Sequence, residues 1–473
     1  MSNATSAAAS AAFDALIIGS GQAGNPLAYA LADAGRRVGL IEADHLGGSC
    51  TNYGCSPTKA LLASAQRAHH VRTAAELGIR APAPTVDFAA VIERMHRLRQ
   101  DSRESLHRKL THDHPGITLL RGRAAFTAPN TLLVRLLEGG EQTITAPLIF
   151  INTGTHAAVP DIPGLANTDY LTNDSLLLHL REQPEHLIIM GGSYIGVEFG
   201  QMFRRLGSRV TILDTGARLM EREDPDVTQP LHDMLAAEGI ELLLKAETRR
   251  VTRLASGEVQ LTIDTPDGER RLRGSHLLVA TGREPNTAGL GLEHAGIELD
   301  EDGYIVVNER LQTAAKGVYA LGDVKGGPQF THISYDDYRV VRDNILHHGH
   351  RTTEGRPVPY VVFTEPQLGR IGLSKRQARE QKVPYRVSRL PARNIGRAVE
   401  TGATEGFVEV LVGDDDRLLG AAVFCEQGGE IMTMFQLAMA GQLRYQELVD
   451  MVIAHPTWAE VLNNAFQRLK PGV

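Results

Sequence analysis

The chain has 473 residues, too many for one hydrophobic core, so we expect several domains. Hydrophobic residues make up 42% and charged residues 22%, as in ordinary globular proteins, and the net charge of −7 argues against a nucleic-acid partner. The sequence contains no long apolar run, which argues against a membrane partner. Its three cysteines are too few for a secreted disulfide scaffold, so we expect a cytoplasmic protein.

The first residues predict a tail and then a nucleotide-binding unit. Residues 1–12 are small, with no basic or leucine-rich run, which favours a disordered tail over a signal peptide. From Phe13 the pattern is apolar strand, glycine turn, helix, second strand and an acid, Glu42. The turn is G-x-G-x-x-G, formed by Gly19, Gly21 and Gly24. Such glycines permit a tight turn, close approach to a pyrophosphate, and close helix–strand packing, while the acid accepts hydrogen bonds from a ribose.

A cysteine pair, Cys50 and Cys55, follows in the sequence GGSCTNYGCSPTK. On an ideal helix, residues five apart have Cα atoms about 8–9 Å apart, whereas a disulfide needs less than about 7 Å. A closed pair therefore requires a distorted turn, to which Gly54 and Pro57 would contribute. A helix N-terminus beneath the pair would lower the thiol pKa. The spacing suits a redox-active disulfide best; a zinc half-site, for which a second cysteine pair is missing, and two inert thiols are the alternatives.

The nucleotide-binding unit returns later in the chain. Its second copy begins at His186 and ends at Asp214. Six residues recur as a like residue 172 positions later: Gly19, Gly24, Gly35, Arg37, Val38 and Glu42 match Gly191, Gly196, Gly207, Arg209, Val210 and Asp214. Ser193 replaces the middle glycine, but a side chain this small keeps the phosphate approach open. Two copies with matched strand, helix and acid predict two dinucleotide sites.

Two apolar strands ending in Thr-Gly, Ile149–Gly154 and Leu277–Gly282, mark places where the chain would cross between domains. Residues 160–164 read as a linker, and the run ending at Asp323 predicts a further strand with an acid at its end. After about residue 350 strand-like runs precede helical ones, which indicates a separate α+β domain.

Together these motifs resemble the class I pyridine nucleotide–disulfide oxidoreductases, the family of lipoamide dehydrogenase, glutathione reductase and mercuric reductase. The resemblance covers the chain from Phe13 onward and includes a C-terminal His455-Pro-Thr-Trp-Ala-Glu460. It implies an α/β fold with two Rossmann-like dinucleotide-binding domains, for FAD and NAD(P), and a C-terminal α+β dimerisation domain. We expect the FAD domain at 13–155 and 280–350, the NAD(P) domain at 156–279 and the interface domain at 351–473.

The resemblance also implies roles for single residues. Cys50 would be the thiol that attacks the acceptor, and Cys55 the thiol that faces the flavin. Lys59 and Glu198 would form an ion pair beside the flavin, and Tyr194 would gate the nicotinamide pocket. In a homodimer, His455 would act as acid and base on the partner subunit's cysteines, oriented by Glu460. The expected FAD residues are Gly19, Gly21, Gly24, Glu42, Gly48, Ser49, Thr153, Gly154, Gly322 and Asp323. The expected NAD(P) residues are Gly191, Ser193, Tyr194, Gly196, Asp214 and Gly282. No resident metal site is expected.

The acid Asp214, followed by Thr215, favours NADH over NADPH, because it suits a free 2′-hydroxyl and repels a 2′-phosphate. Arg218 would retain some NADPH binding. Cys425 lies in an apolar run and is expected to be a buried structural thiol.

The acceptor is predicted only as a class. The phrases FINTG, GGSYIG and FTHISYDDY resemble a mercuric reductase-like subgroup, similar to copper-reducing reactive-chlorine-resistance flavoproteins. Mercury itself is disfavoured, because the C-terminus has no vicinal cysteines, no N-terminal metal-binding module precedes the FAD unit, and a catalytic-type histidine is present. The first hypothesis is therefore an NADH-dependent reductase of a small-molecule disulfide, a quinone or a metal ion. Dihydrolipoyl dehydrogenase and a flavin-binding redox sensor without turnover are the alternatives.

Overall fold

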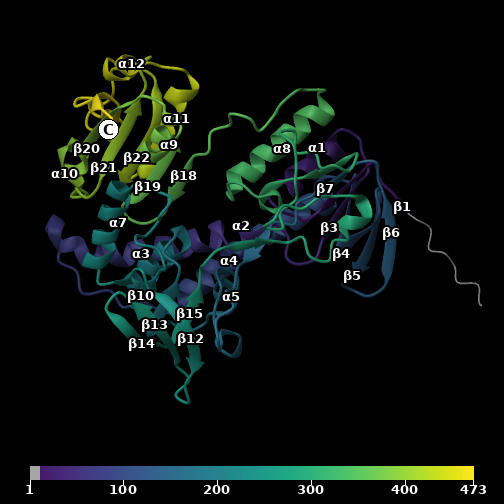
Figure 1. Cartoon of the computed structure of the whole chain (residues 1–473), viewed down its shortest axis with the longest axis horizontal. Coiled ribbons are helices and arrows are strands. Elements are labelled where there is room, and N and C mark those ends of the chain that lie inside the picture. The colour runs from purple at the N-terminus through teal and green to yellow at the C-terminus, as the bar shows by residue number, and fades with distance from the viewer. Residues whose placement is uncertain (1–10, 473) are drawn as a thin grey trace, which may run out of the picture.

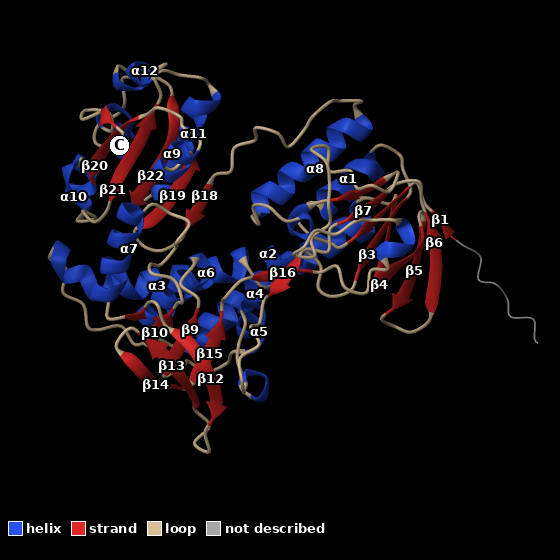
Figure 2. Cartoon of the chain, in the orientation of Figure 1, coloured by secondary structure: helices blue, strands red, loops and turns tan. Residues whose placement is uncertain are grey.

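The computed structural model describes residues 11–472 and shows three lobes, each built around one or two sheets (Figure 1). Of the predicted tail, residues 1–10 lie outside the described part, and Ala11–Ala12 form strand β1. The α/β class predicted from the sequence is confirmed, with both helices and strands in each of the three lobes (Figure 2). Within residues 11–472 no helix has the length and apolar character that crossing a bilayer requires.

The first lobe is an eight-stranded sheet in the order β1-β6-β5-β4-β3-β2-β7-β17. The strands are β2 (Ala15–Ile18), β3 (Val38–Glu42), β4 (Ile117–Ala128), β5 (Thr131–Leu136), β6 (Glu141–Thr145), β7 (Ile149–Ile151) and β17 (Val318–Ala320). From β4 to β17 all neighbours are parallel, whereas β4, β5 and β6 form an antiparallel meander. The residues of β2 and β3 are all buried, as expected for a parallel sheet that is covered on both faces. The helices α1 (Gly24–Asp33) and α8 (Thr331–Leu346) pack against each other in this lobe.

A helical hairpin joins the first two lobes. It consists of α2 (Gly48–Asn52), α3 (Cys55–Thr73), the 3₁₀ turn η1 (Ala74–Leu77), α4 (Phe88–Arg108) and the π turn η2 (Lys109–Asp113). Helix α3 packs against α4 on one side and against a helix of the second lobe on the other.

The second lobe is a four-stranded parallel sheet in the order β11-β10-β9-β15, with a three-stranded antiparallel sheet beside it. The strands are β9 (His186–Met190), β10 (Arg209–Leu213), β11 (Glu241–Leu243) and β15 (His276–Val279), and then β12 (Glu247–Arg253), β13 (Val259–Thr265) and β14 (Gly268–Gly274). The helices are α5 (Asn173–His179), α6 (Tyr194–Leu206) and α7 (Pro225–Ala237). Two short strands, β8 (Thr155–Ala157) and β16 (Arg283–Pro285), pair antiparallel where the chain enters and leaves this lobe. The two expected crossings therefore lie side by side.

The third lobe is a six-stranded antiparallel sheet in the order β18-β19-β22-β21-β20-β23. The strands are β18 (Tyr360–Val362), β19 (Gln367–Gly372), β20 (Arg386–Pro391), β21 (Phe407–Val412), β22 (Leu418–Cys425) and β23 (Lys470–Pro471). The helices are α9 (Lys375–Glu380), α10 (Gly396–Thr401), α11 (Gly428–Ala440), α12 (Tyr445–Val449) and α13 (Val461–Asn464). Short 3₁₀ turns complete the chain: η3 (Leu165–Asn167), η4 (Leu292–Ala295), η5 (Gly322–Lys325), η6 (Ala392–Asn394) and η7 (Trp458–Glu460).

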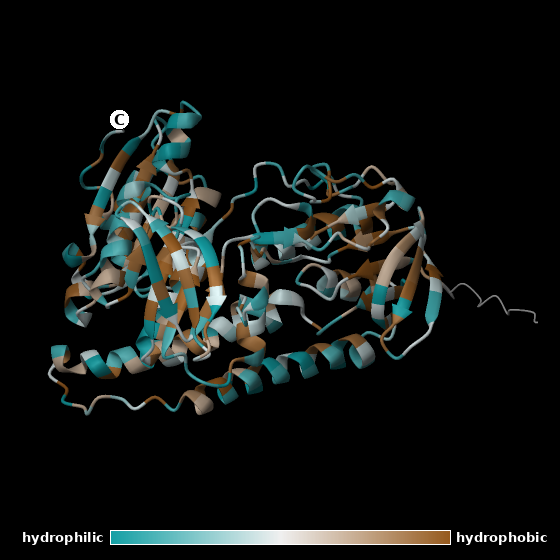
Figure 3. Cartoon of the chain, turned by 60° about the horizontal axis from the view of Figure 1, so that its bottom comes forward, coloured by the Kyte–Doolittle hydropathy of each residue, from teal (hydrophilic) through white to brown (hydrophobic). Residues whose placement is uncertain are grey.

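Apolar residues are concentrated on the strands of the sheets, and hydrophilic ones on the outer helix faces and turns (Figure 3). Cys425 lies at the end of β22 and is fully buried. The sheets show which strands belong together, and the domain boundaries expected from the sequence stay predictions.

Buried charges join the second and third lobes. Glu223, just before α7, and Arg370, on β19, are 3.0 Å apart, and both side chains are at least 96% buried. The neighbouring Asp224 accepts the backbone N–H groups of Lys375 and Arg376, at the start of α9. This contact fixes the loop that follows the second nucleotide unit against the third lobe.

We predict that Arg370→Met lowers the midpoint of thermal unfolding by about 5 °C, because it leaves the Glu223 carboxylate buried without a cation. Circular dichroism on heating measures this. The double variant Arg370→Met/Glu223→Met is the control, and it is expected to recover most of the loss. A single variant as stable as the unmodified protein would contradict the role of the pair.

Candidate active site

A cavity of about 1100 Å³ lies where the three lobes and the helical hairpin meet. It gathers thirteen of the residues predicted from the sequence: Gly19, Gly21, Glu42, Gly48, Ser49, Cys50, Cys55, Lys59, Thr153, Gly154, Tyr194, Glu198 and Asp323. Residues of β18 and α11, such as Tyr360 and Met432, close it on the side of the third lobe. Segments far apart in the sequence therefore share one site.

The two cysteines lie on two different helices. Helix α2 carries Cys50 and stops at Asn52, and α3 starts with Cys55 after Tyr53 and Gly54. A Cβ at Gly54 would lie 3.0 Å from the Ser49 carbonyl oxygen, so glycine avoids a tight contact where the chain folds back. The expected distortion is thus a complete break at Gly54, whereas Pro57 lies in the first turn of α3, where its missing N–H is not needed.

Polar side chains from α4 and α5 hold this break. Arg99, which is 7% exposed, donates to the carbonyl oxygens of Asn52 and Leu177, at 3.4 and 3.0 Å. Arg103 donates to Asn52 Oδ1 at 2.5 Å, and Asn173 Nδ2 donates to the Tyr53 carbonyl at 3.0 Å. The contacts to the Asn52 and Tyr53 carbonyls satisfy backbone oxygens at the end of the short helix α2. No sequence signal pointed to them, because Arg99 and Arg103 read as ordinary residues of an amphipathic helix.

The start of α2 touches the first glycine turn. The Gly47 N–H donates to the Ser20 carbonyl oxygen at 2.9 Å, and a Cβ at Gly48 would lie 3.0 Å from Gly21 Cα. Gly47 has φ +100° and Gly48 has φ +62°, backbone conformations that favour glycine. The cysteine-bearing segment is therefore packed directly on the predicted phosphate turn.

The two thiols differ strongly in acidity. A hydrogen bond from the Cys50 thiol, a second from the Thr331 hydroxyl and the nearby Lys59 cation lower the pKa of Cys55 to about 6, although burial opposes this. The same hydrogen bond and burial raise the pKa of Cys50. Cys55 also stands at the first position of a 19-residue helix, whose N-terminal dipole favours an anion. The arrangement therefore favours the thiolate on Cys55 and the thiol on Cys50.

Lys59 and Glu198 lie beside the cysteines as an ion pair, with Lys59 Nζ 2.8 Å from Glu198 Oε2. The other carboxylate oxygen of Glu198 accepts the Phe363 N–H at 2.9 Å, and the Phe363 ring lies 4.3 Å from Lys59 Nζ. Phe363, from the third lobe, thus fixes both members of the pair. It was not predicted from the sequence, since a phenylalanine after a strand carries no chemical signature.

The two acids of the repeat make equivalent hydrogen bonds in the two units. Glu42 accepts the backbone N–H groups of Ser20 and Asp44 at 2.8 and 2.7 Å. Asp214 accepts those of Gly192 and Gly216 at 2.5 and 2.7 Å, and both donors lie 172 positions after their counterparts. A carboxylate accepts up to about four hydrogen bonds, so each keeps capacity for ribose hydroxyls.

The remaining predicted residues lie outside the cavity lining. Gly24 and Gly322 do not line it, and of the expected NAD(P) residues only Tyr194 does. Tyr194 belongs to a group of rings with Phe330, at 6.2 Å, which in turn stacks on Tyr360 at 5.5 Å.

His455 and Glu460 lie on the third lobe and do not line the cavity of their own chain. His455 Nδ1 is 2.9 Å from Glu460 Oε1, and this hydrogen bond raises the pKa of His455. The imidazole side chain is 74% exposed. The pair is formed and faces outward.

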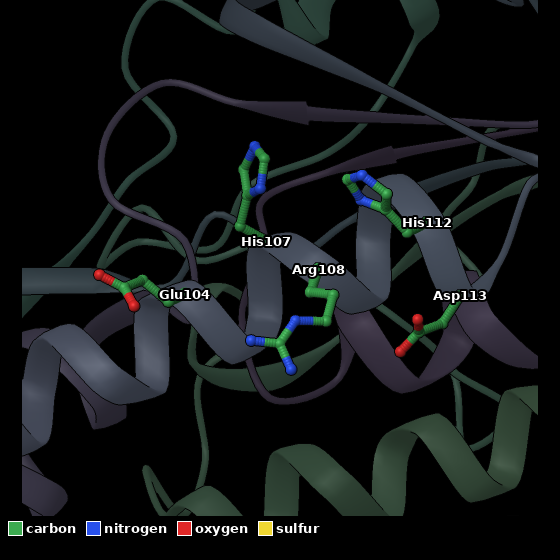
Figure 4. Close-up of a pocket in the computed structure, with 5 residues that line it drawn as sticks. All are labelled: Glu104, His107, Arg108, His112 and Asp113. Carbon is green, nitrogen blue, oxygen red and sulfur yellow. The ribbon is translucent and has the colours of Figure 1, made fainter.

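A second, shallow pocket lies at the end of α4, lined by Glu104, His107, Arg108, His112 and Asp113, whose side chains point in different directions (Figure 4). Within residues 11–472 no group of three His, Cys, Asp or Glu side chains is arranged to hold a metal ion. This pocket brings no catalytic set together.

Comparison with known proteins agrees with this arrangement. A family model described as pyridine nucleotide-disulphide oxidoreductase matches residues 13–337, and the model of its dimerisation domain matches residues 358–466. The probable pyridine nucleotide-disulfide oxidoreductase RclA of Escherichia coli K12 is 39% identical, over 97% of this chain and 99% of its own length. A mercuric reductase of Streptomyces lividans is 36% identical, over 96% of each chain.

A solved structure shows the same fold. The Cu(II) complex of the HOCl-induced flavoprotein disulfide reductase RclA from Escherichia coli superimposes with a TM-score of 0.87, at 39% identity, over 96% of this chain and 98% of the other.

We predict that Thr331→Val raises the pKa of Cys55 above about 6, because the thiolate loses a hydroxyl donor. Titration of the ultraviolet thiolate absorbance of the reduced protein measures this. Cys425 does not interfere, since burial raises its pKa to about 12. Thr331→Ser keeps the hydroxyl and serves as the control; an unshifted midpoint in Thr331→Val would show that the hydroxyl contributes nothing.

Proposed function

The chain belongs to the pyridine nucleotide-disulphide oxidoreductase family, flavin-dependent enzymes of the oxidoreductase class, and we propose that it passes electrons from NADH through FAD to the Cys50–Cys55 pair and on to a small-molecule disulfide or a metal ion. One observation carries the proposal. Two cysteines, Cys50 and Cys55, line the same cavity as the first glycine turn, and the Thr331 hydroxyl lies 3.2 Å from the sulfur of Cys55.

The residues of the cavity suit FAD. Gly154, with φ +69°, lines it, and a Cβ at this position would meet no atom within 4 Å, which leaves the backbone open to a ligand. Glu42, Gly19, Gly21 and Asp323 line the same cavity. Glu42 would accept hydrogen bonds from a ribose, Gly19 and Gly21 would let the backbone approach phosphates, and Asp323 would contact the ribityl region. Bound FAD would supply the transfer of an electron pair between a nicotinamide and a disulfide.

The cysteines then supply thiol–disulfide exchange. With a disulfide acceptor, the sulfur of Cys50 attacks one acceptor sulfur, and the other leaves as a thiolate. The Cys55 thiolate attacks Cys50 in the mixed disulfide, which releases the second acceptor thiol and re-forms the Cys50–Cys55 disulfide. Two thiols are oxidised and one disulfide is reduced. Because the pKa of Cys50 is raised, its proton needs a base, and the leaving thiolate needs an acid.

We propose that the partner subunit's His455 is this acid and base in a homodimer. The match to the dimerisation domain and the outward-facing His455–Glu460 pair support this. Glu460 would hold the ring in one orientation and favour the imidazolium form.

His455→Ala is therefore expected to lower turnover with a disulfide acceptor by about 10²- to 10⁴-fold. Reduction of the bound flavin by NADH, followed by stopped-flow absorbance, should stay near the rate of the unmodified enzyme. Glu460→Gln is expected to have a smaller effect of the same kind, with its pH optimum displaced to lower pH. An unchanged turnover in His455→Ala would remove the histidine from the mechanism.

NADH is the proposed electron donor, since the carboxylate of Asp214 closes the second unit. We expect kcat/KM for NADH to exceed that for NADPH at least about tenfold. Asp214→Asn should reduce the preference for NADH over NADPH, because it removes the negative charge. The asparagine side chain keeps an oxygen that can accept the Gly192 N–H. Steady-state kinetics with both nucleotides measure this, and a preference for NADPH in the unmodified enzyme would contradict the assignment.

For the acceptor, the likeness to the copper complex favours Cu(II), and the resemblance to mercuric reductases favours a soft metal ion in general. A second candidate is dihydrolipoyl dehydrogenase, which the His455–Glu460 pair favours. Anaerobic NADH consumption with Cu(II), Hg(II), lipoamide, glutathione disulfide and a quinone separates them. We expect NADH to be consumed faster with Cu(II) than with the other acceptors. Rapid reduction of NAD by dihydrolipoamide would instead establish the second candidate.

A further inference from the structure

A single buried side chain, Asn152, lies between the two turns assigned to FAD. It follows β7 and is 8% exposed. Its Oδ1 accepts the N–H of Gly24, at the start of α1, at 2.9 Å, and its Nδ2 donates to the carbonyl oxygen of Leu321, at the end of β17, at 2.8 Å. One partner is a donor and the other an acceptor, so the orientation of the amide is fixed.

The glycines of both turns pack against this residue. A Cβ at Gly19 would lie 2.3 Å from the Asn152 carbonyl oxygen, one at Gly21 would lie 2.6 Å from Oδ1, and one at Gly322 would lie 2.8 Å from Nδ2. The amide cannot move away from a side chain at position 21 without breaking its hydrogen bonds. Glycine at position 21 is therefore required by Asn152 itself, in addition to any phosphate.

The second nucleotide unit is an internal comparison. There Ala280 takes the place of Asn152: a Cβ at Gly191 would lie 2.3 Å from the Ala280 carbonyl oxygen, the same distance as in the first unit. Alanine has no amide to fill the space. The middle glycine of that unit is replaced by Ser193. The first unit therefore combines Asn152 with glycine at the middle position of the turn, and the second unit combines Ala280 with serine there.

The second FAD turn is anchored on its other side by a charge. Asp337, which is fully buried, accepts the Gly322 N–H at 2.8 Å and faces the cations Lys325 and Arg356, at 3.4 and 2.5 Å. The Leu321–Gly322 peptide is thus held by Asn152 through its carbonyl and by Asp337 through its N–H. This rigid peptide presents Asp323 to the cavity.

We propose that Asn152 is a positioning residue of the FAD site, which joins the phosphate turn and the ribityl turn into one preformed unit and sets the requirement for glycine at position 21. This role rests on the proposed function, which assigns the cavity to FAD. The second unit has alanine in the place of Asn152 and so lacks this side-chain bridge.

A double-mutant cycle on FAD affinity tests this. The full chain is stripped of flavin, and the dissociation constant for FAD is measured by the quenching of flavin fluorescence. Asn152→Ala is expected to raise the constant about tenfold, because a buried donor and a buried acceptor lose their partner. Gly21→Ser should raise it at least as much. In a protein that already carries Asn152→Ala, Gly21→Ser should raise the dissociation constant less than about threefold. The second unit has the same pair of residues, Ala280 and Ser193, at the equivalent positions.

Two variants refine the test. Asn152→Asp keeps an acceptor for the Gly24 N–H but loses the donor to Leu321, so its effect should lie between those of the unmodified protein and Asn152→Ala. Asn130→Ala, in the exposed turn between β4 and β5, is the matched control and should leave the constant unchanged.

The outcomes separate the two levels of the account. If the unmodified chain binds no FAD, the proposed function is wrong. If it binds FAD and Gly21→Ser weakens binding by the same factor with and without Asn152, the inference is overturned. If Gly21→Ser alone yields no flavin-binding protein and the double variant does, the inference is supported; if neither does, the coupling is absent and the inference is overturned.

Discussion

The break of the chain at Gly54 is the constraint on which the rest of this site depends. Because of it, the end of one helix and the start of the next bring together two residues that a continuous helix would keep apart. In this arrangement the pKa of Cys55 is lowered and that of Cys50 is raised. In the proposed function, the sulfur of Cys55 faces the electron donor and the sulfur of Cys50 meets the acceptor.

The surroundings of the pair come from every lobe. The first lobe provides the glycine turn on which α2 rests, and the helical hairpin provides the arginines that hold the break. The second lobe contributes Glu198, and the third contributes Phe363, whose backbone and ring hold the Lys59–Glu198 pair in place. Rigid contacts between lobes, such as Glu223 with Arg370, therefore matter for chemistry that occurs at a distance from them.

The parts that have a short local signature could be predicted from the sequence. The two glycine units, the acids at their ends and the C-x4-C pair are each determined by backbone geometry or by chemistry within a few residues, and their placement in the fold follows. Asn152, Phe363 and Arg99 could not be predicted in the same way, because their roles arise only when distant segments meet and their residue types are common in cores and helices. The repeat contains one further difference: Ser193 stands where the first unit has glycine, and only the structure shows that this goes with Ala280 in the place of Asn152.

The central claim is that the cysteine pair exchanges electrons with a flavin bound in the same cavity. Anaerobic reductive titration of the purified, FAD-loaded protein measures this most directly. The account predicts that each chain takes up two electron pairs, one for FAD and one for the Cys50–Cys55 disulfide, and that Cys55→Ser takes up only one. Uptake of a single pair by the unmodified protein, with both thiols free from the start and unreactive toward the flavin, would contradict it.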